Sequence, residues 1–428
     1  FTGRAGNAWL DTDVFAFVID IPEDYVTNGK ITLAQDFEDE IEITKADAEK
    51  KASFGEIKFN AAGVYTFTIK EVDTGIQGVT YDLAPRTVTV TVEDNSSGAL
   101  EIKSVAITGG ESNNLTFKNT YSAGSLTWPK DKLTVTKNVT GRDPSWDGTD
   151  TFNFELKAKP GDTATETAVQ NSLIVFEKTK TAISVDKTGT AAGDFGQITF
   201  KDGVLGGESK QTFTFVVSEV QGSTPIPGMS YAPDQTFSVT VQDNGTGGMT
   251  IEPETVNLTF TNTYKADEVV VGDDEVAVTV KKTLTGRDWT DDDSFTFKLE
   301  ANDKNTETAL GNDTVVFGTD KAATDVETEI KKDTKDLTSN FGAITFNKVG
   351  TYQFKVTENQ PTDDNADLEG VQNEGVTYDA SVKTFTVIVT DPGNGQLSAK
   401  VQVAGSSAKG NVEGEVEFEF TNAYAPNP

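Results

Sequence analysis

LTFTNTY, at Leu258–Tyr264, has the alternating pattern of a β-strand with one buried face. It alternates apolar and polar residues, and its amide, Asn262, falls on the same parity as Leu258 and Phe260. Because side chains of a strand alternate between its two faces, this amide is expected to point into a core. A buried amide without a partner costs roughly 1–3 kcal/mol. The rest of the chain should therefore supply hydrogen-bonding partners for it.

This stretch recurs, and the recurrence divides the chain into tandem units. It returns as LTFKNTY at Leu115–Tyr121 and as FEFTNAY at Phe418–Tyr424. The string TGR begins at Thr2, Thr140 and Thr285. A period of roughly 140 residues is too long for a solenoid repeat and suits a globular domain with its own core. We predict three domains, at residues 1–124, 125–266 and 267–428.

The strand pattern predicts an all-β fold. Runs of Val, Thr, Phe, Tyr and Ile are separated by Gly, Asn, Asp and Pro, as in QTFSVTVQDNGTGG at Gln235–Gly248. Each unit is expected to be an immunoglobulin-like β-sandwich, and short linkers predict an elongated rod. Thr44–Ala52 and Thr319–Lys335 are richer in Ala, Glu and Lys and predict turns or short helices in connections.

Composition excludes several classes of function. The 36 basic and 68 acidic residues give a net charge of -32, which argues against nucleic acid or an anionic membrane as the main partner. Cysteine and histidine are absent, which excludes disulfides, a Ser-His-Asp triad and the usual zinc ligand sets. No run approaches the roughly 20 apolar residues needed to span a bilayer, and no signal peptide opens the sequence. We expect a mature or excised extracellular chain that inserts into no membrane.

Two further polar residues fall on apolar faces when the units are aligned. One ends a middle strand: Glu71, Glu219 and Glu358 follow YTFTIK, FTFVVS and YQFKVT. The other is Lys137 in LTVTKNV and Lys282 in VAVTVKKTL, where the adjacent Lys281 has the opposite parity. A single such residue usually bends into solvent. Two complete sets in the same order predict two buried trios: Lys137, Glu219 and Asn262, then Lys282, Glu358 and Asn422.

Burial gives these groups a chemistry. A lysine in an apolar core has a lowered pKa, so its neutral amine becomes a nucleophile, whereas a buried glutamic acid has a raised pKa and can hold a proton. The acid could donate to the Asn carboxamide oxygen and carry protons as ammonia leaves. Contact between amine and amide supplies effective molarity. We therefore predict a Lys–Asn amide cross-link formed once, with no turnover, no cofactor and no metal.

Taken together, TGR, FGxIxF, the strand that ends in Glu and the terminal FTNTY, with Lys before TGR, resemble the streptococcal FctA-type pilin isopeptide linkage domain. The resemblance covers nearly the whole chain. It implies a Gram-positive surface protein, either a pilus shaft subunit or an adhesin stalk, located outside the cell in a pilus or anchored to the cell wall. Its partners would be neighbouring pilin subunits or the cell wall, joined through sortase. The implied bonds are Lys137–Asn262 with Glu219 and Lys282–Asn422 with Glu358.

The first unit departs from this pattern. Phe1 aligns with Val139, two residues after Lys137, so the first strand is missing. Glu71 and Asn119 are present without a matching Lys, and the site is expected to be incomplete. Either that strand was removed, or a strand from elsewhere fills the gap.

Weaker signals leave alternatives open. TWPKD at Thr127–Asp131 loosely resembles a pilin motif, which would make Lys130 a possible sortase acceptor, although an ordinary Pro-containing linker is the simpler explanation. The acidic run Asp291–Asp293 lacks the spacing of a calcium loop. Long loops such as Gln360–Glu374 leave a host glycan- or matrix-binding adhesin module as the alternative function. A surface hydrolase is disfavoured, because repetition argues against a single active site.

Overall fold

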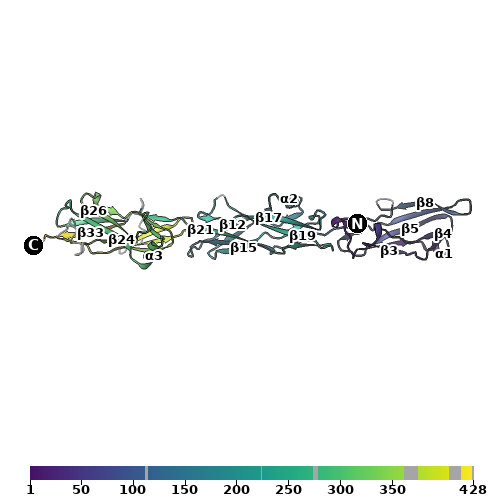
Figure 1. The fold of residues 1–428 in the computed structure, drawn as a ribbon, viewed down its shortest axis with the longest axis horizontal. Coiled ribbons are helices and arrows are strands. Elements are labelled where there is room, and N and C mark those ends of the chain that lie inside the picture. Colours follow the sequence, from purple (N-terminus) through teal and green to yellow (C-terminus); the bar gives the residue numbers. More distant parts are fainter. Residues whose placement is uncertain (111–113, 223, 273–277, 361–374, 404–415, 427–428) are drawn as a thin grey trace.

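The chain forms a rod of three β-sandwiches in a row, as seen in a computed structural model (Figure 1). The structure describes residues 1–428 except 111–113, 223, 273–277, 361–374, 404–415 and 427–428. Domain one lies at one end of the rod and domain three at the other, so the predicted all-β tandem architecture is confirmed. Among the described helices, none has the length and apolar character required to cross a membrane.

Domain two shows the complete sandwich. Its five-stranded sheet runs in the order β14 (Lys180–Val185), β12 (Asp150–Ala158), β17 (Lys210–Val220), β19 (Gln235–Asp243) and β20 (Met249–Glu252). Its four-stranded sheet runs in the order β15 (Thr190–Asp194), β11 (Leu133–Thr140), β21 (Val256–Tyr264) and β18 (Met229–Ser230). A smaller sheet consists of β10 (Leu126–Trp128), β16 (Ile198–Phe200) and β13 (Ile174–Phe176).

Domain three repeats this arrangement strand for strand. Its five-stranded sheet has the order β26 (Asp325–Lys331), β24 (Ser294–Ala301), β29 (Gly350–Glu358), β31 (Lys383–Thr390) and β32 (Ser398–Val403). Its four-stranded sheet has the order β27 (Thr338–Asn340), β23 (Val278–Thr285), β33 (Val416–Tyr424) and β30 (Val376–Thr377). Its small sheet consists of β22 (Val269–Val271), β28 (Ile344–Phe346) and β25 (Val315–Phe317).

The alternation read from the sequence places the core between the two larger sheets. Along β21 the buried and exposed residues alternate without exception, and Phe260 is fully buried. Its ring lies 5.1 Å from that of Phe154 on the opposite sheet, in an edge-to-face arrangement. Burying side chains of this size stabilises the sandwich by roughly 2–3 kcal/mol each. The core therefore fixes which face of each strand is inward.

Domain one has one complete sheet and a reduced second one. The complete sheet has the order β3 (Glu40–Thr44), β1 (Val14–Asp20), β5 (Gly63–Val72), β7 (Arg86–Asp94) and β8 (Leu100–Thr108). The remaining strands form two pairs, β2 (Ile31–Leu33) with β4 (Ile57–Phe59) and β6 (Val79–Thr80) with β9 (Thr120–Tyr121). The buried residues form two separate clusters, around Phe67 and around Phe15, where domains two and three each have one. Among the described residues, domain one thus has no counterpart of β11, as predicted.

The described helical elements are short and lie in connections. They are the α-helices α1 (Glu23–Thr27), α2 (Thr163–Gln170) and α3 (Lys304–Gly311) and the 3-10 turns η1 (Ala5–Asn7), η2 (Ala48–Lys50) and η3 (Lys335–Leu337). Of the two segments predicted to hold turns or short helices, Thr44–Ala52 contains η2. Thr319–Lys335 has turns on both sides of strand β26 and reaches η3 at Lys335, so the turns were predicted and the strand between them was not. Helices α2 and α3 were not predicted.

Neighbouring domains meet in a joint that occurs twice. The Tyr264 hydroxyl at the end of β21 donates to Asp391 Oδ1 of domain three at 2.8 Å and accepts from Gly395 N–H at 3.1 Å. Tyr121 makes the same pair of bonds to Asp243 and Gly247 of domain two, at 2.6 and 2.9 Å. Each joint therefore packs the end of one domain against a hairpin of the next.

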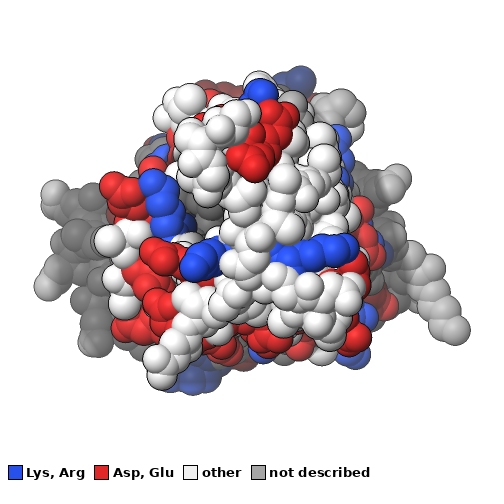
Figure 2. All heavy atoms as spheres, turned by 90° about the vertical axis from the view of Figure 1, so that its right-hand side faces the viewer, with Lys and Arg blue, Asp and Glu red and all other residues white. Residues whose placement is uncertain are grey.

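The surface carries the acidic excess of the composition. Figure 2 looks onto the end of the rod formed by domain one, where basic side chains lie near the middle among uncharged residues and acidic side chains lie mostly toward the edges of the view. With a net charge of -32, such a surface resists non-specific association.

Candidate lysine–asparagine sites

In domain two, the predicted lysine and asparagine lie on neighbouring strands. Strands β11 and β21 pair in parallel, with Lys137 opposite Phe260 and Val139 opposite Asn262. Both polar side chains are on the inward face, and both residues are fully buried. Strands β11 and β21 are the central pair of the four-stranded sheet, and together they bring the amine and the amide to one place in the core.

Glu219 reaches these groups from the opposite sheet. It lies on β17, paired with Phe154 of β12, and its side chain is buried. One carboxylate oxygen, Oε2, lies 2.9 Å from Lys137 Nζ. The other, Oε1, accepts a hydrogen bond from Asn262 Nδ2 at 2.7 Å. The carboxyl group therefore contacts both the amine and the nitrogen of the amide.

The oxygen of the amide has a different partner. Asn262 Oδ1 accepts a hydrogen bond from the backbone N–H of Ala232 at 2.8 Å. Since a backbone N–H can only donate, it fixes the orientation of the amide, with Nδ2 toward Glu219. The prediction that the acid donates to the amide oxygen differs from the structure, in which a backbone N–H contacts that oxygen and the carboxyl group contacts the amide nitrogen.

Domain three holds the same arrangement. Lys282 on β23 and Asn422 on β33 lie on parallel neighbouring strands. Lys282 Nζ donates to Glu358 Oε2 at 2.9 Å, as Lys137 does to Glu219 Oε2, and it also lies 2.7 Å from Oε1. Asn422 Nδ2 donates to the same oxygen at 2.8 Å. Asn422 Oδ1 accepts from the backbone N–H of Asp379 at 2.8 Å. Two sites built from different sequences therefore have the same set of contacts.

Burial disfavours the charged forms of both lysines and of Glu358. Burial lowers the pKa of the Lys137 and Lys282 ammonium groups, an effect that their glutamate partners oppose. Burial likewise raises the pKa of Glu358, against the influence of Lys282. Taking an ammonium and a carboxylate out of water costs several kcal/mol per ion, which a single contact does not fully restore. Proton transfer from lysine to glutamate would remove both charges.

Domain one holds an incomplete version of the site. Asn119 Nδ2 donates to Glu71 Oε1, and Asn119 Oδ1 accepts from the backbone N–H of Asp82 at 2.8 Å. Glu71 is buried, and its second oxygen, Oε2, has no hydrogen-bond partner among the described residues. Burial raises the pKa of this carboxyl to about 7. The described residues thus form the acid and amide parts of the site, and the orphaned oxygen is the one that contacts lysine in domain two.

A known family matches the chain over most of its length. The family described as FctA, Spy0128-like isopeptide containing domain, matches the chain three times, at residues 2–122, 133–265 and 278–425. The chain belongs to the FctA family. No curated protein matches it.

Several solved structures are similar to this FctA chain at low identity. The major pilin T-13 from Streptococcus pyogenes has 18% identity and a TM-score of 0.22, covering 71% of this chain and 100% of its own. The Bacillus anthracis TIE protein has 10% identity and a TM-score of 0.21, covering 96% of this chain and 52% of its own. A mutant of the shaft pilin SpaA from Lactobacillus rhamnosus GG has 9% identity and a TM-score of 0.16, covering 70% and 100%. The family assignment depends on the sequence match alone.

Sequence reasoning missed the backbone donors of these FctA domains. Each donor follows a tyrosine in a recurring string: VTYD at Val79–Asp82, MSYA at Met229–Ala232 and VTYD at Val376–Asp379. The repeated Tyr was a usable signal, because it follows the same short strand in each unit. The sequence could not show which residue donates, because every residue except proline carries a backbone N–H.

The weaker candidates lie apart from the three sites. Lys130 is exposed on the turn between β10 and β11, close to the buried Trp128. Asp293 pairs with Arg287 at 2.6 Å, and Asp291 pairs with Lys332 at 2.7 Å. Among the residues that the structure describes, no group of three or more acidic side chains could hold a metal ion. The loop Gln360–Glu374, considered for host binding, lies outside the described residues beyond its first residue.

Proposed function

We propose that this FctA chain is a structural protein of the cell surface, a pilus shaft subunit or an adhesin stalk, stabilised by Lys137–Asn262 and Lys282–Asn422 isopeptide bonds. The observation that carries the proposal is the repeated contact of a buried carboxyl with both a lysine amine and an asparagine amide. A chance buried polar cluster would not recur with the same strands, the same order and the same backbone donor. Membership of an isopeptide-containing family supports the same chemistry.

The reaction follows from the contacts. In the neutral pair, the Lys137 amine attacks Cγ of Asn262, and negative charge develops on Oδ1, where the Ala232 N–H donates. Glu219 accepts a proton from the attacking nitrogen and delivers one to Nδ2, which it already contacts. The Cγ–Nδ2 bond breaks, ammonia leaves and the acid is regenerated. Each domain reacts once, so the chain is not an enzyme in the sense of turnover.

The bonds would join the strands through which tension enters and leaves a domain. The strands that carry the lysine and the asparagine are parallel neighbours, so pulling on the rod shears one along the other. A covalent link between Lys137 and Asn262 closes a loop of well over a hundred residues. Loop-closure entropy of that size stabilises a domain by about 5 kcal/mol. We infer that resistance to force and to proteolysis is the purpose of the cross-links.

A further part of the proposal concerns how the chain is joined to neighbouring subunits. The exposed turn that carries Lys130 is accessible to an enzyme that joins subunits, so we propose Lys130 as a sortase acceptor for a neighbouring pilin subunit. Lys130→Arg would test this in the producing cell: high-mass covalent polymers should disappear while the intramolecular bonds remain. Polymers of undiminished length would exclude Lys130.

Intact-mass measurement tests the cross-links directly. The folded chain should be lighter than its sequence by two ammonia molecules, and Lys137→Ala or Glu219→Ala should each restore one. Lys281→Ala is the matched control, because Lys281 neighbours Lys282 on the strand but has the opposite parity, so both losses should persist. A mass equal to that of the sequence would exclude the proposed bonds.

A further inference from the structure

In domains two and three, the backbone N–H that contacts the asparagine oxygen lies on a short loop between two strands. In domain two this donor loop is residues 231–234, between β18 and β19, and the N–H belongs to Ala232. In domain three it is residues 378–382, between β30 and β31, and the N–H belongs to Asp379. Loops are more mobile than the strands they connect. The position of the donor therefore depends on what holds its loop to the strand that carries the asparagine.

In domain three, the side chain of Asp379 holds the loop to β33. Its Oδ2 accepts a hydrogen bond at 3.2 Å from the backbone N–H of Thr421, the residue immediately before Asn422. Its Oδ1 accepts from the backbone N–H of Ser381 at 2.9 Å, within the loop. Burial raises the pKa of this carboxyl, but its hydrogen bonds with Ser381 and Thr421 outweigh that effect, so the pKa lies below its ordinary value. An ionised carboxylate therefore joins the donor loop to the asparagine strand through a charge-assisted hydrogen bond.

Domain two uses a different side chain for the same purpose, because its donor residue is an alanine. Gln235, the first residue of β19, donates from Nε2 to the backbone carbonyl of Thr259 on β21. Thr259 lies three residues before Asn262 on that strand. The contact thus holds the end of the donor loop to the asparagine strand from its other side.

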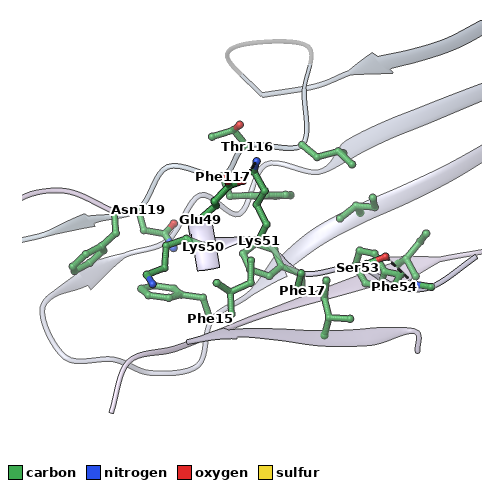
Figure 3. A pocket seen from close by; sticks show the side chains of 18 of the residues that line it. Phe15, Phe17, Glu49, Lys50, Lys51, Ser53, Phe54, Thr116, Phe117 and Asn119 are labelled. Carbon is green, nitrogen blue, oxygen red and sulfur yellow. Dashed lines mark hydrogen bonds and ion pairs between the residues drawn. The ribbon is translucent and has the colours of Figure 1, made fainter. Parts of the chain in front are cut away.

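Domain one contains both kinds of contact. Asp82, its donor residue, accepts at Oδ2 from the backbone N–H of Lys118 at 3.1 Å. Arg86, the first residue of the following strand, donates from Nη2 to the carbonyl of Thr116 at 3.0 Å. Thr116 and Asn119 line the pocket shown in Figure 3. The side chains at these two positions differ among the three domains, yet every domain holds its donor loop to the asparagine strand by at least one of them.

We propose that Asp379 in domain three and Gln235 in domain two are positioning residues for cross-linking, each holding the donor loop against the asparagine strand so that the backbone N–H stays on the amide oxygen. This inference rests on the proposed function, because it concerns the same reaction at the same two sites. Both side chains act through the backbone donor and not on the reacting atoms. Negative charge develops on the amide oxygen as the amine attacks, so a donor that is held there beforehand lowers the barrier more than one that must first be ordered.

Removing one of these side chains should slow its own domain only. Asp379→Ala should slow the domain three cross-link by about tenfold, which corresponds to about 1.4 kcal/mol of barrier, and leave domain two at the wild-type rate. Gln235→Ala should give the reverse pattern. Asp234→Ala is the matched control, because Asp234 is an exposed aspartate on the donor loop of domain two. Cell-free synthesis of the full chain, sampled over time and followed by peptide mapping, would assign each ammonia loss to its domain.

Exchanging the two kinds of contact separates positioning from a general loss of stability. Lys383→Gln, added to Asp379→Ala, gives domain three the glutamine that domain two uses at the first position of the strand after the loop. Ala232→Asp, added to Gln235→Ala, gives domain two the aspartate that domain three uses. Each second substitution should restore most of the lost rate. Circular dichroism of each variant would establish that it is folded.

Each outcome decides one question. If the wild-type chain loses two ammonia molecules and both alanine variants link as fast as the wild type, this inference is overturned and the proposed function stands. A wild-type chain without ammonia loss would exclude the proposed bonds and this inference with them. Slow linking that the second substitution does not restore would show that Asp379 and Gln235 serve the fold rather than the placement of the donor, which also overturns the inference.

Discussion

At the scale of single residues, the backbone N–H of Ala232 is the donor placed where negative charge would develop. It lies 2.8 Å from Asn262 Oδ1, so it is already in place before the amine attacks. A donor that is fixed in advance needs no reorganisation during the reaction, which is why oxyanion-type contacts contribute strongly to rates. The glutamate cannot replace it, because its two oxygens face Lys137 and Asn262 Nδ2.

Removing this donor should slow cross-linking in domain two. Ala232→Pro deletes the N–H, and the loss of one such donor typically costs on the order of 100-fold or more in rate. Ala232→Ser keeps the N–H and is the control. Cell-free synthesis followed by intact-mass measurement over time should show domain two linking late in the proline variant and promptly in the serine variant. Equal rates in the two variants would show that the N–H plays no part.

A second prediction at this scale concerns pH. The carboxyl of Glu71 has a pKa of about 7 in folded domain one because of burial, against an ordinary value of 4.5. Asp82 and Arg86, which pair at 2.7 Å, are the charged groups that face it. Between these pKa values the folded domain binds more protons than the unfolded one. The stabilisation is therefore complete below pH 4.5 and is lost as pH rises through about 7.

Hydrogen exchange of β5 peptides would measure this effect. Protection should fall with rising pH, by at most about 1.4 kcal/mol of opening free energy per pH unit between the two pKa values. Glu71→Gln cannot ionise, so its protection should be flat over the same range after correction for the intrinsic exchange rate. A wild-type profile as flat as that of the variant would contradict the raised pKa.

At the scale of secondary-structure elements, parity of apolar residues predicted most of what matters. It placed Lys137, Glu219 and Asn262 on inward faces. In a strand with one buried face, a shift of one residue would turn every apolar side chain to solvent, so the apolar residues fix which side chains point inward. It failed at β26, whose sequence DVETEIK is charged because it is an edge strand. Lys298 on the neighbouring strand pairs with Asp325 at 3.0 Å, so these charges satisfy each other across the sheet edge.

Helices α2 and α3 were missed for a different reason. Both are short and polar, so neither shows the apolar stripe by which helices are recognised. Their signals were local: the string TETA occurs at Thr165–Ala168 and again at Thr306–Ala309. An aspartate before each helix caps it, with Asp162 and Asp303 accepting from backbone N–H groups at 3.0 and 2.8 Å. Repetition, rather than periodicity, would have revealed them.

At the scale of the whole molecule, the straightness of the rod depends on the two joints. In each, an arginine of TGR lies over the tyrosine ring: Arg142 is 3.7 Å from the centroid of Tyr264, and Arg4 is 4.5 Å from that of Tyr121. The facing hairpin approaches so closely that a Cβ on Gly395 would meet the Gly228 nitrogen at 2.9 Å, and its φ of +85° also favours glycine. Both joints therefore depend on the same three features: arginine, tyrosine and a glycine hairpin.

Loosening one joint should bend the rod without unfolding it. Tyr264→Phe removes the hydroxyl that bonds to Asp391 and Gly395, which is expected to cost about 1–3 kcal/mol of interface free energy, because Asp391 and the Gly395 N–H lose a partner. Distances between spin labels in domains two and three should then spread over a wider range. Tyr424→Phe is the matched control, since Tyr424 holds the same position at the end of β33 in domain three, beyond both joints. Because the Lys137–Asn262 link lies inside domain two, the mass of the Tyr264 variant should still show both ammonia losses. An unchanged distance distribution would mean that the short linker alone keeps the two domains aligned.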